Sequence, residues 1–393
     1  MVQRHDIVIV GGGNAGISLA GRARRLGFDD VAVIDPGPVH RYRPLLNYVA
    51  GGQASLDRLT KPMRSVIPDG CTWIARRAAA VDTDAGEVEL DDGSRVAYGD
   101  LVLAPGLVPD LGAVRGLEEA MRGGWASTGH LASSAPNAWR AIQRTRQGTV
   151  VFSIPPEPSP CGGTALKPLF LACDHWRREG VLTSIDVHLV TPYEAVLDLP
   201  FVEAELEQSL RRFGVTVHHR ATVRELDSAT RWVILDTAGN EAVVDKVEEA
   251  FIVPPYRAPE WLAPLAGADP AGLVDIDPET LAHRRVPRLW SLGDVAAVQT
   301  RPSGGALRRQ VDILADNLRR SRDGEPLRRY DGYTIIPITV DRRRLLLAEF
   351  DRTGSPQPTV ERLDLSVPRR SLWAFDRYVE PVVYFRALLK GRV

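Results

Sequence analysis

One cysteine stands where its chemistry could be reactive. Cys161 lies in the segment 155–168, which reads PPEPSPCGGTALKP, directly before a Gly-Gly pair. A helix is expected to begin near Thr164, and Lys167 would lie one turn into it. The thiolate is the reactive form of cysteine, and its pKa falls at a helix N-terminus or beside a cation. The pattern therefore predicts that Cys161 is a catalytic thiol assisted by Lys167.

A glycine-rich turn near the N-terminus predicts a dinucleotide site. The apolar run 6–10 (DIVIV) indicates a buried strand, the turn 11–16 (GGGNAG) follows it, and 17–26 is expected to be helical. A second strand, 31–34, ends on Asp35, about twenty residues past the turn. Such glycines let backbone amides approach a pyrophosphate, and the acidic residue accepts a hydrogen bond from a ribose hydroxyl.

Two later segments favour FAD over NAD as the bound dinucleotide. The strand 101–103 closes on a small-residue turn, 104–106, and the strand 289–292 ends in Gly-Asp before a helix expected over 305–319. With the first turn, these resemble the three sequence marks of flavoproteins that have two dinucleotide-binding domains. In that class the aspartate binds the flavin ribityl chain, and the positive end of the following helix stabilises negative charge on reduced flavin. The predicted cofactor-binding residues are Gly11, Gly12, Gly13, Asn14, Ala15, Gly16, Asp35, Pro44, Ala78, Ala104, Pro105, Gly106, Gly293 and Asp294.

The segment between these marks is predicted to be a second α/β unit. Its expected elements are strands at 149–154 and 184–190, helices at 164–178 and 202–213, and strands near Val215, Trp232 and Ala250. In NAD(P)H-dependent relatives this unit has a glycine loop of its own after the first strand. Here prolines and Cys161 replace that loop, and the second strand ends in Thr191-Pro192 rather than in an acidic residue. Pyridine-nucleotide binding is therefore disfavoured.

The predicted fold is α/β, with tandem Rossmann-like FAD/NAD(P)-binding domains and a C-terminal α+β appendage. The FAD-binding domain is discontinuous, because its sequence marks lie on both sides of the second unit. The predicted divisions are residues 1–110 and 256–330 for the FAD-binding domain, 111–255 for the second Rossmann-like domain, and 331–393 for the C-terminal region.

Several ordered segments of the chain resemble the sulfide:quinone oxidoreductases, in the branch that contains the mitochondrial enzyme. The resemblance spans almost the whole chain. The segments that carry it are the glycine turn, HRYRP at 40–44, SVIP at 65–68, CGG at 161–163 with Lys167, TLAHRR at 280–285, Gly293-Asp294, YDGYT at 330–334 and LAEFD at 347–351.

This resemblance implies a monotopic flavoprotein in which two cysteines carry sulfur and the flavin passes two electrons to a quinone. Cys161 matches the first family cysteine. The second would follow Gly293-Asp294, where this chain has Val295, and the usual Thr-Ser-Lys is altered to Thr300-Arg301-Pro302. The second redox cysteine is therefore missing.

Neither of the other two cysteines is expected to replace it. Cys173 is twelve residues further along a helix, about 18 Å away if that helix is straight, and Cys71 matches no family cysteine. Each is expected to act as a small hydrophobic residue. An adduct on Cys161 would then be resolved by an external thiol or sulfide, or the flavin would take the electrons through a direct adduct. Glu157 and His175 are candidate proton carriers, although each is more often a solvated residue.

Residues 367–393 form an aromatic and basic tail. Apolar side chains from Leu372 to Leu389 interleave with arginines and Lys390, and Pro381 is expected to break the tail into two helices. In the resembled family this region docks on the membrane surface and frames the quinone entrance. Apolar and basic faces suit an anionic bilayer. The alternative is a tail packed on the body or against a second subunit, so a homo-oligomer stays open.

The bulk composition fits a cytoplasmic protein. Charge is nearly balanced, with 49 basic and 50 acidic residues among 393, so no nucleic-acid partner is indicated. Three cysteines form no disulfide framework, and no metal site is predicted. No apolar run approaches the roughly 18 residues of a spanning helix. We expect a cytoplasmic location, with peripheral attachment to the inner face of the cell membrane left open.

Four functions compete at this point. The first is an FAD enzyme that oxidises sulfide, a small thiol or a persulfide through Cys161 and reduces a quinone. The second is a soluble single-cysteine flavoenzyme that oxidises another thiol or organic substrate, which Val295 favours. The third is a regulatory protein that keeps FAD without turnover. The fourth is an NAD(P)H:quinone reductase, against which the absent second glycine loop argues.

Overall fold

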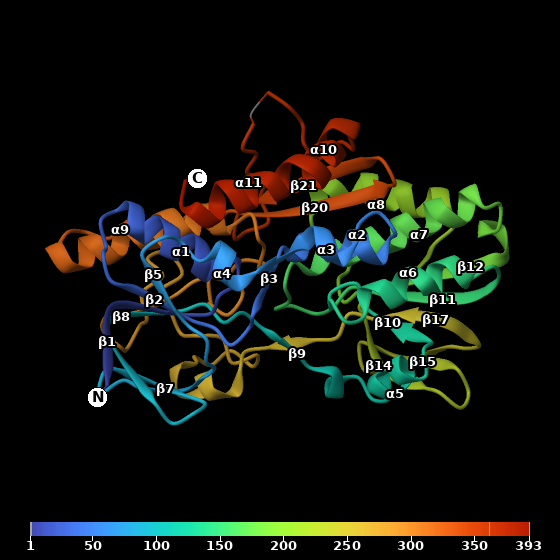
Figure 1. Ribbon diagram of the computed structural model, residues 1–393. Coiled ribbons are helices and arrows are strands. Elements are labelled where there is room, and N and C mark those ends of the chain that lie inside the picture. Colours follow the sequence, from blue (N-terminus) through green and yellow to red (C-terminus); the bar gives the residue numbers. More distant parts are fainter. Residues whose placement is uncertain (1, 361, 393) are drawn as a thin grey trace.

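The computed structural model of the protein describes residues 2–360 and 362–392. Two sheets with parallel cores stand side by side, and the C-terminal elements lie across the top of both (Figure 1). This arrangement confirms the predicted α/β class with tandem Rossmann-like units. The exact domain divisions stay a prediction.

The first sheet joins the N-terminal strands to one late strand. Its order is β5-β2-β1-β8-β7-β6, with β19 paired to β8 as a seventh strand of the described chain. The strands β5, β2, β1, β8 and β19 run parallel, whereas β6 and β7 form an antiparallel hairpin. Their bounds are β1 Gln3–Val10, β2 Val31–Ile34, β5 Cys71–Ile74, β6 Ala78–Asp82, β7 Glu87–Leu90, β8 Arg95–Leu103 and β19 Leu289–Ser291. Because β19 pairs with β8, segments on both sides of the second unit share one sheet.

The second unit holds a five-stranded parallel sheet in the order β10-β17-β11-β12-β13. A separate antiparallel sheet, β14-β15-β16, lies between β13 and β17 in the chain and was missed from the sequence apart from the strand near Trp232. Short apolar runs between turns carry little periodicity, so such hairpins are hard to predict. The bounds are β10 Ala126–Ser127, β11 Gly148–Ser153, β12 Ile185–Val190, β13 Thr216–His218, β14 Ala221–Asp227, β15 Trp232–Thr237, β16 Asn240–Val244 and β17 Val247–Phe251.

Helices cover both sheets, and three two-stranded pairs complete the fold. The longer helices are α1 Asn14–Arg25, α6 Ala135–Arg144, α7 Leu166–Arg178, α8 Pro200–Phe213 and α9 Leu307–Asp323. The shorter ones are α2 Leu46–Ala50, α3 Leu56–Leu59, α4 Met63–Val66 and α5 Leu117–Arg122. The pairs are β3 Val39–Arg41 with β4 Thr60–Pro62, β9 Val108–Pro109 with β18 Tyr256–Arg257, and β20 Thr334–Asp341 with β21 Arg344–Phe350.

The tail forms one helical run rather than two helices. Helix α10 Arg370–Ala374 passes through a π-helical turn, Phe375–Val379, directly into α11 Glu380–Arg386. The predicted break at Pro381 is therefore wrong. Pro381 lies in the first turn of α11, directly after the π turn, whose wider spacing accommodates the proline within the run.

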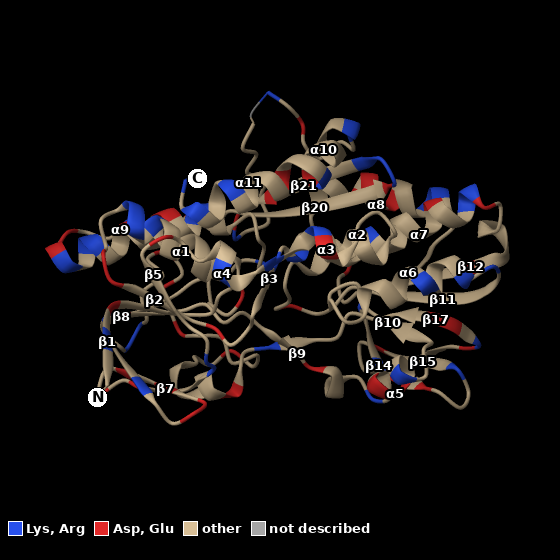
Figure 2. Ribbon diagram, in the orientation of Figure 1, with Lys and Arg blue, Asp and Glu red and all other residues tan. Residues whose placement is uncertain are grey.

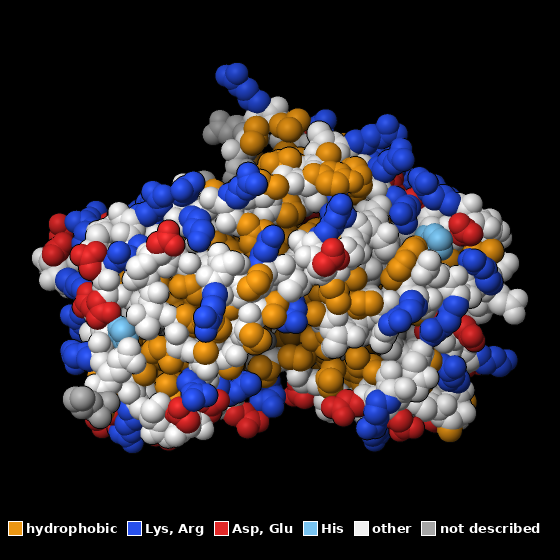
Figure 3. Space-filling view, in the orientation of Figure 1, with side chains coloured by type: hydrophobic (Ala, Val, Ile, Leu, Met, Phe, Trp, Pro, Cys, Tyr) orange, Lys and Arg blue, Asp and Glu red, His pale blue; other side chains and the backbone are white. Residues whose placement is uncertain are grey.

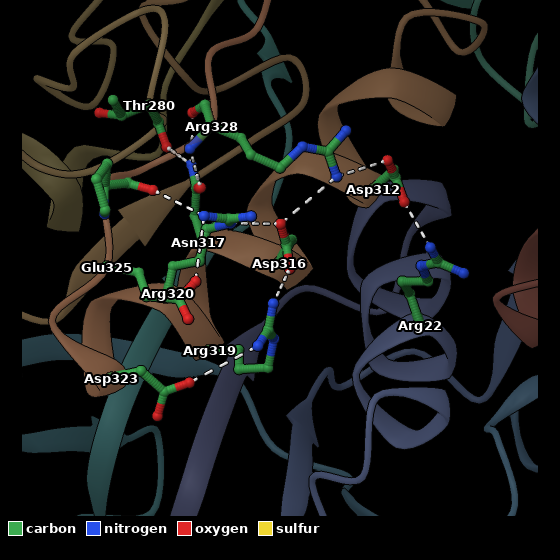
Figure 4. Close-up of polar contacts among 11 residues, drawn as sticks. Arg22, Thr280, Asp312, Asp316, Asn317, Arg319, Arg320, Asp323, Glu325 and Arg328 are labelled. Atoms are coloured by element: carbon green, nitrogen blue, oxygen red, sulfur yellow. Dashed lines mark hydrogen bonds and ion pairs between the residues drawn. The ribbon is translucent and has the colours of Figure 1, made fainter.

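An ion-pair network fixes α9 against α1 (Figure 4). Asp312 accepts from Arg22 at 2.6 Å and from Arg328 at 3.0 Å, and Asp316 pairs with Arg319 and Arg320. A cavity of about 530 Å³ opens beside this network, lined largely by arginines. Among the described residues that line it, none belongs to the predicted cofactor or cysteine sites. The Arg22–Asp312 pair therefore links α1 to α9, whereas the other pairs lie within α9 or join it to the segment that follows it.

The surface charge and the helix lengths bear on possible partners. Basic and acidic residues are interspersed over both lobes in the view of Figure 2, in keeping with the formal net charge of −1. Within 2–360 and 362–392, no helix combines the length and the apolar character needed to cross a membrane.

Candidate active site

The turn between β1 and α1 has a shape that requires its glycines. Gly11 has a φ of +113°, and a Cβ there would overlap the carbonyl oxygen of Ala104, where β8 ends. A Cβ on Gly16 would overlap the carbonyl oxygen of Gly11. The Gly12 N–H donates to the Asp35 carboxylate at 2.7 Å. The fold therefore brings the glycine turn, Asp35 and the end of β8 together.

The Gly293-Asp294 turn lies against the same place. It follows β19, and the Gly293 N–H donates to the side-chain oxygen of Gln310 on α9 at 2.9 Å. A Cβ on Gly293 would touch the Cβ of Ala15 in the first turn of α1. The three sequence marks thus meet at the carboxyl ends of β1, β8 and β19, the edge at which parallel sheets bind ligands.

The groups at this edge fit a flavin dinucleotide. The Asp294 carboxylate is half-buried, burial raises its pKa, and the nearby Arg43 partly offsets that rise. A carboxylate in such a setting is suited to accept hydrogen bonds from ribityl hydroxyls. Beside Gly13, at the start of α1, there is open space that would admit a diphosphate at a helix N-terminus. The residues therefore fit the cofactor that the sequence predicts.

The other predicted cofactor residues lie on several different elements. The Asn14 side chain donates to the Gly304 carbonyl at 3.4 Å, ahead of α9. Pro105 and Gly106 follow β8 directly, and Gly106 has a φ of +72° with open space around it. Pro44 lies in a short turn, Arg43–Leu45. Ala78 starts β6, paired with Leu90 at the sheet edge, and its role stays a prediction.

Cys161 occupies a strained turn after β11. Its φ of 55° is a left-handed conformation that side chains other than glycine rarely adopt, and such strain gathers at functional sites. The Cys161 N–H donates to the Pro302 carbonyl at 3.1 Å, and its carbonyl accepts from the Thr164 hydroxyl at 2.7 Å. A 3₁₀ turn, Gly162–Ala165, then leads into α7. The turn is thereby tied to the segment that follows Gly293-Asp294.

The thiolate that the sequence predicts is opposed by the protein around it. Cys161 is half-buried, and its removal from water raises the pKa of the thiol to about 12. Lys167 lowers this pKa, as expected, but Asp294 and Glu157 raise it. Desolvation and the two carboxylates therefore outweigh Lys167, so the pKa of Cys161 is shifted toward the neutral thiol rather than the thiolate.

A pH profile of alkylation tests this protonation state. Because the thiolate is the minor form, its population should grow about tenfold per pH unit between about pH 7 and 9, and the alkylation rate with it. Iodoacetamide labelling followed by mass spectrometry of the peptide that contains Cys161 measures the rate. Cys173, fully buried in α7, is the internal control and should stay unlabelled. A rate that levels off below about pH 8 would contradict the raised pKa.

Lys167 has a stronger partner than Cys161. Its ammonium is fully buried, 3.0 Å from the carboxylate of Asp376 in the tail, and lies over the ring of Tyr48. The Tyr48 hydroxyl donates to the same carboxylate at 2.6 Å. Lys167 therefore joins the cysteine helix α7 to the tail, and its charge is largely neutralised there.

A polar cluster lies on the other side of the Cys161 turn. The Tyr193 hydroxyl donates to Glu157 at 3.1 Å, and the Glu157 carboxylate accepts from the Ser159 N–H at 3.0 Å. The guanidinium of Arg301 stacks over Tyr193, 4.4 Å from the ring centre. Glu157 thus belongs to the neighbourhood of the cysteine, whereas His175 packs against Trp139 at the far end of α7.

Several of these groups were missed from the sequence. Arg43, Tyr193 and Asp376 were not assigned a role, and Arg301 was noted only as a departure from the family pattern. Val295, which directly follows Gly293-Asp294 and where we expected the second family cysteine, is fully buried. Cys71 is half-buried on β5 and Cys173 is buried on α7. The described structure therefore offers no partner thiol beside Cys161.

The chain as a whole is similar to known oxidoreductases. Residues 5–142 match the family model described as pyridine nucleotide-disulphide oxidoreductase. The chain is 29% identical over 99% of its length, and 87% of the relative, to the mitochondrial sulfide:quinone oxidoreductase of Mus musculus. It is also 29% identical over 98% of its length, and 86% of the relative, to that of Dictyostelium discoideum. The solved sulfide:quinone oxidoreductase of Aquifex aeolicus shares the fold, with a TM-score of 0.79, 18% identity and coverage of 100% of this chain and 92% of that one.

Fold and site together define an FAD-dependent oxidoreductase with two dinucleotide-binding units. Within that class, the chain is similar over almost its whole length to sulfide:quinone oxidoreductases. The predicted resemblance and cofactor are confirmed.

Proposed function

We propose that this flavoprotein oxidises sulfide or a small thiol or persulfide at Cys161 and passes the electrons through FAD to a quinone. The observation that supports it best is the link between the Cys161 turn and the segment after Asp294, through the Cys161 N–H and the Pro302 carbonyl. Asp294 is close enough to raise the pKa of the thiol. The sulfur and the flavin-binding carboxylate thus share one neighbourhood.

The proposed chemistry balances with one protein sulfur. The Cys161 thiol and hydrogen sulfide form an S–S bond, release two protons and give up two electrons. Bound FAD supplies the two-electron acceptor, and a quinone then takes the electrons and two protons. An external thiol or sulfide removes the outer sulfur and restores Cys161. Lys167, Asp294 and Glu157 are the charged groups that act on the pKa of that sulfur, and we propose that Lys167 and Glu157 control charge and protons around it.

The residues that we propose to hold FAD are those predicted from the sequence. The turn 11–16 would hold the diphosphate, Asp35 a ribose, and Asp294 the ribityl chain. Asp35 already accepts from the Gly12 N–H at 2.7 Å through one carboxylate oxygen and from the Gly37 N–H at 2.7 Å through the other. These bonds hold the carboxylate in place at the mouth of the turn.

A second function is favoured by the buried Val295. A chain without a resolving cysteine can oxidise another small thiol or organic substrate at the flavin and need no sulfur relay. The two functions differ in whether sulfide alone reduces the flavin.

Anaerobic titration of the flavin-bound protein separates them. We expect sulfide to bleach the flavin absorbance, an added water-soluble quinone to restore it, and NADH to leave it unchanged. Bleaching by small thiols but not by sulfide would support the second function. Bleaching by NADH would contradict both, because it requires a nucleotide site that the prolines around Cys161 replace.

We also propose that the tail attaches the protein to the inner face of the cell membrane. Phe375, Tyr378, Val379 and Val382 are 44, 54, 46 and 50% exposed. In Figure 3 apolar side chains gather over the top of the molecule, where α10 and α11 lie, with basic residues around them. An exposed apolar patch rimmed by basic residues suits an anionic bilayer surface.

Point substitutions test this better than removal of the tail. The tail also supplies Asp376 to Lys167 and Tyr384 to His40, at 2.7 Å, so truncation would disturb the site itself. Replacing Phe375 and Val382 with serine should reduce co-sedimentation with anionic phospholipid vesicles at least severalfold. Val243, an apolar residue 43% exposed on β16, gives the control, Val243→Ser, which should bind as the wild type does. Equal binding by all three proteins would contradict membrane attachment by the tail.

A further inference from the structure

Arg301 combines two properties that call for a partner. Its side chain is half-buried beside the Cys161 turn, yet its Nη1 atom is fully buried and has no hydrogen-bond partner within the described residues. It forms no ion pair in the described parts of the chain, although its charge reaches Glu157. A guanidinium withdrawn from water without an acceptor is costly, so arginines in this setting usually bind an anion.

A second unpartnered group lies on the same turn. Ser159 is completely buried, and its hydroxyl has no partner among the described residues. It lies so close to the Cys161 turn that a Cβ on Gly162 would overlap its Oγ. An unsatisfied buried hydroxyl beside a cysteine is a second sign of a polar ligand at this place.

Aromatic rings hold the guanidinium of Arg301 in place, but no carboxylate forms an ion pair with it in the described residues. Arg301 stacks on Tyr193 and lies 5.9 Å from the ring centre of Phe350, which fixes its plane. Its neighbour Pro302 accepts the Cys161 N–H, so the cation and the thiol are coupled through one residue of backbone. Glu157 is the one carboxylate that faces this group from the cysteine segment, and Tyr193 and Ser159 already hold it.

We propose that Arg301 binds the anionic group of the external sulfur acceptor, so that this protein prefers a small organic thiol carrying a carboxylate or sulfonate. The inference rests on the proposed function, because it concerns the step that restores Cys161. The acceptor thiolate attacks the outer sulfur of the Cys161 persulfide, a new S–S bond forms to the acceptor, and the old one breaks. Cys161 leaves as a thiolate and takes a proton, and no further oxidant is needed.

The lack of a second cysteine gives this site its purpose. Without a protein thiol to hold the sulfur, the acceptor must come from solution. An arginine fork orients a carboxylate or sulfonate in a defined geometry, which places the acceptor sulfur reproducibly.

Steady-state kinetics with two acceptors of similar size test the proposal. In the flavin-bound protein, quinone reduction by sulfide is measured with 3-mercaptopropionate and with the neutral 2-mercaptoethanol. The wild type should have the higher kcat/KM with the anionic acceptor. Arg301→Gln should lower the ratio of the two values about tenfold or more, through KM for 3-mercaptopropionate, whereas Arg301→Lys should keep part of the preference.

Arg309→Gln is the matched control, because Arg309 also stacks on a tyrosine, 3.9 Å from the ring of Tyr333, but lies on α9 beside the arginine-lined cavity. It should leave the ratio unchanged.

Sulfide bleaching of the flavin, recorded without any acceptor, distinguishes failure of the proposed role of Arg301 from failure of the proposed function. Bleaching in wild type and Arg301→Gln with an unaltered acceptor ratio overturns the role of Arg301 alone. No bleaching in the wild type overturns the proposed function and this inference with it.

Discussion

Cys161→Ser is expected to abolish the bleaching of the flavin by sulfide, with a fall in rate of at least about a thousandfold. A serine hydroxyl cannot form an S–S bond, so the proposed step that gives up electrons is lost rather than slowed. Stopped-flow absorbance under anaerobic conditions measures it directly. The substitution replaces sulfur with oxygen at a turn whose hydrogen bonds come from the backbone and from Thr164, so the fold should persist.

Cys173→Ser is the control, because this thiol is fully buried in α7. It should lose some stability and keep its bleaching rate per bound flavin. Full-rate bleaching in Cys161→Ser would mean that sulfide reaches the flavin without the protein sulfur, and the sulfur relay would have to be abandoned. Loss of FAD from Cys161→Ser is detected by its flavin content and is not read as loss of chemistry.

The parts of the site that sequence patterns predicted are those built from local backbone requirements. Gly11 and Gly16 are needed because their neighbours leave no room for a Cβ. This requirement of the turn can be read directly from the glycines in the sequence. The same holds for the Gly293-Asp294 turn, whose glycine has a φ of +78°. Three such turns in order predict the sheet edge at which they meet, and hence the cofactor.

The parts that sequence patterns missed depend on contacts between distant residues. Lys167 and Asp376 are 209 positions apart, and each is of a type that usually lies in solvent. Nothing in either segment indicates that the two are buried together. The error over the Cys161 thiolate has the same origin, because the sequence showed the lysine but not the carboxylate that neutralises it or the burial that outweighs it. The continuous helix through Pro381 likewise reflects a π turn that no local pattern predicts.

The tail exposes apolar side chains on its outer face and contacts the predicted site on its inner face. Its outer side chains face solvent, while Asp376 reaches the helix that begins behind the Cys161 turn and Tyr384 reaches His40, whose ring nitrogen lies 2.9 Å from the Gly12 carbonyl. On the inner face, Asp376 is connected to Cys161 through Lys167, and Tyr384 is connected to the glycine turn through His40. The buried pair Lys167–Asp376 is the link whose loss should be most costly to the fold.

Lys167→Met is expected to destabilise the protein by about 3–5 kcal/mol, because it leaves the Asp376 carboxylate buried with only the Tyr48 hydroxyl as a partner. With an unfolding entropy of about 2.1 cal/mol/K per residue, 393 residues give roughly 0.8 kcal/mol/K. The melting temperature, followed by the rise in flavin fluorescence on release, should then fall by roughly 4–6 °C. Methionine keeps the volume of the lysine stem, so a cavity contributes little.

Two further variants show whether the loss comes from the buried charge. The exposed pair Arg211–Glu207 on α8 has a similar separation, 3.0 Å, and Arg211→Gln should shift the melting temperature by less than about 1 °C. Adding Asp376→Asn to Lys167→Met should recover part of the loss, because the unpaired charge is removed with its partner. If the double variant is less stable than the single one by the full effect of Asp376→Asn alone, the two residues act independently. The buried pair would then not be what holds the tail to the cysteine helix.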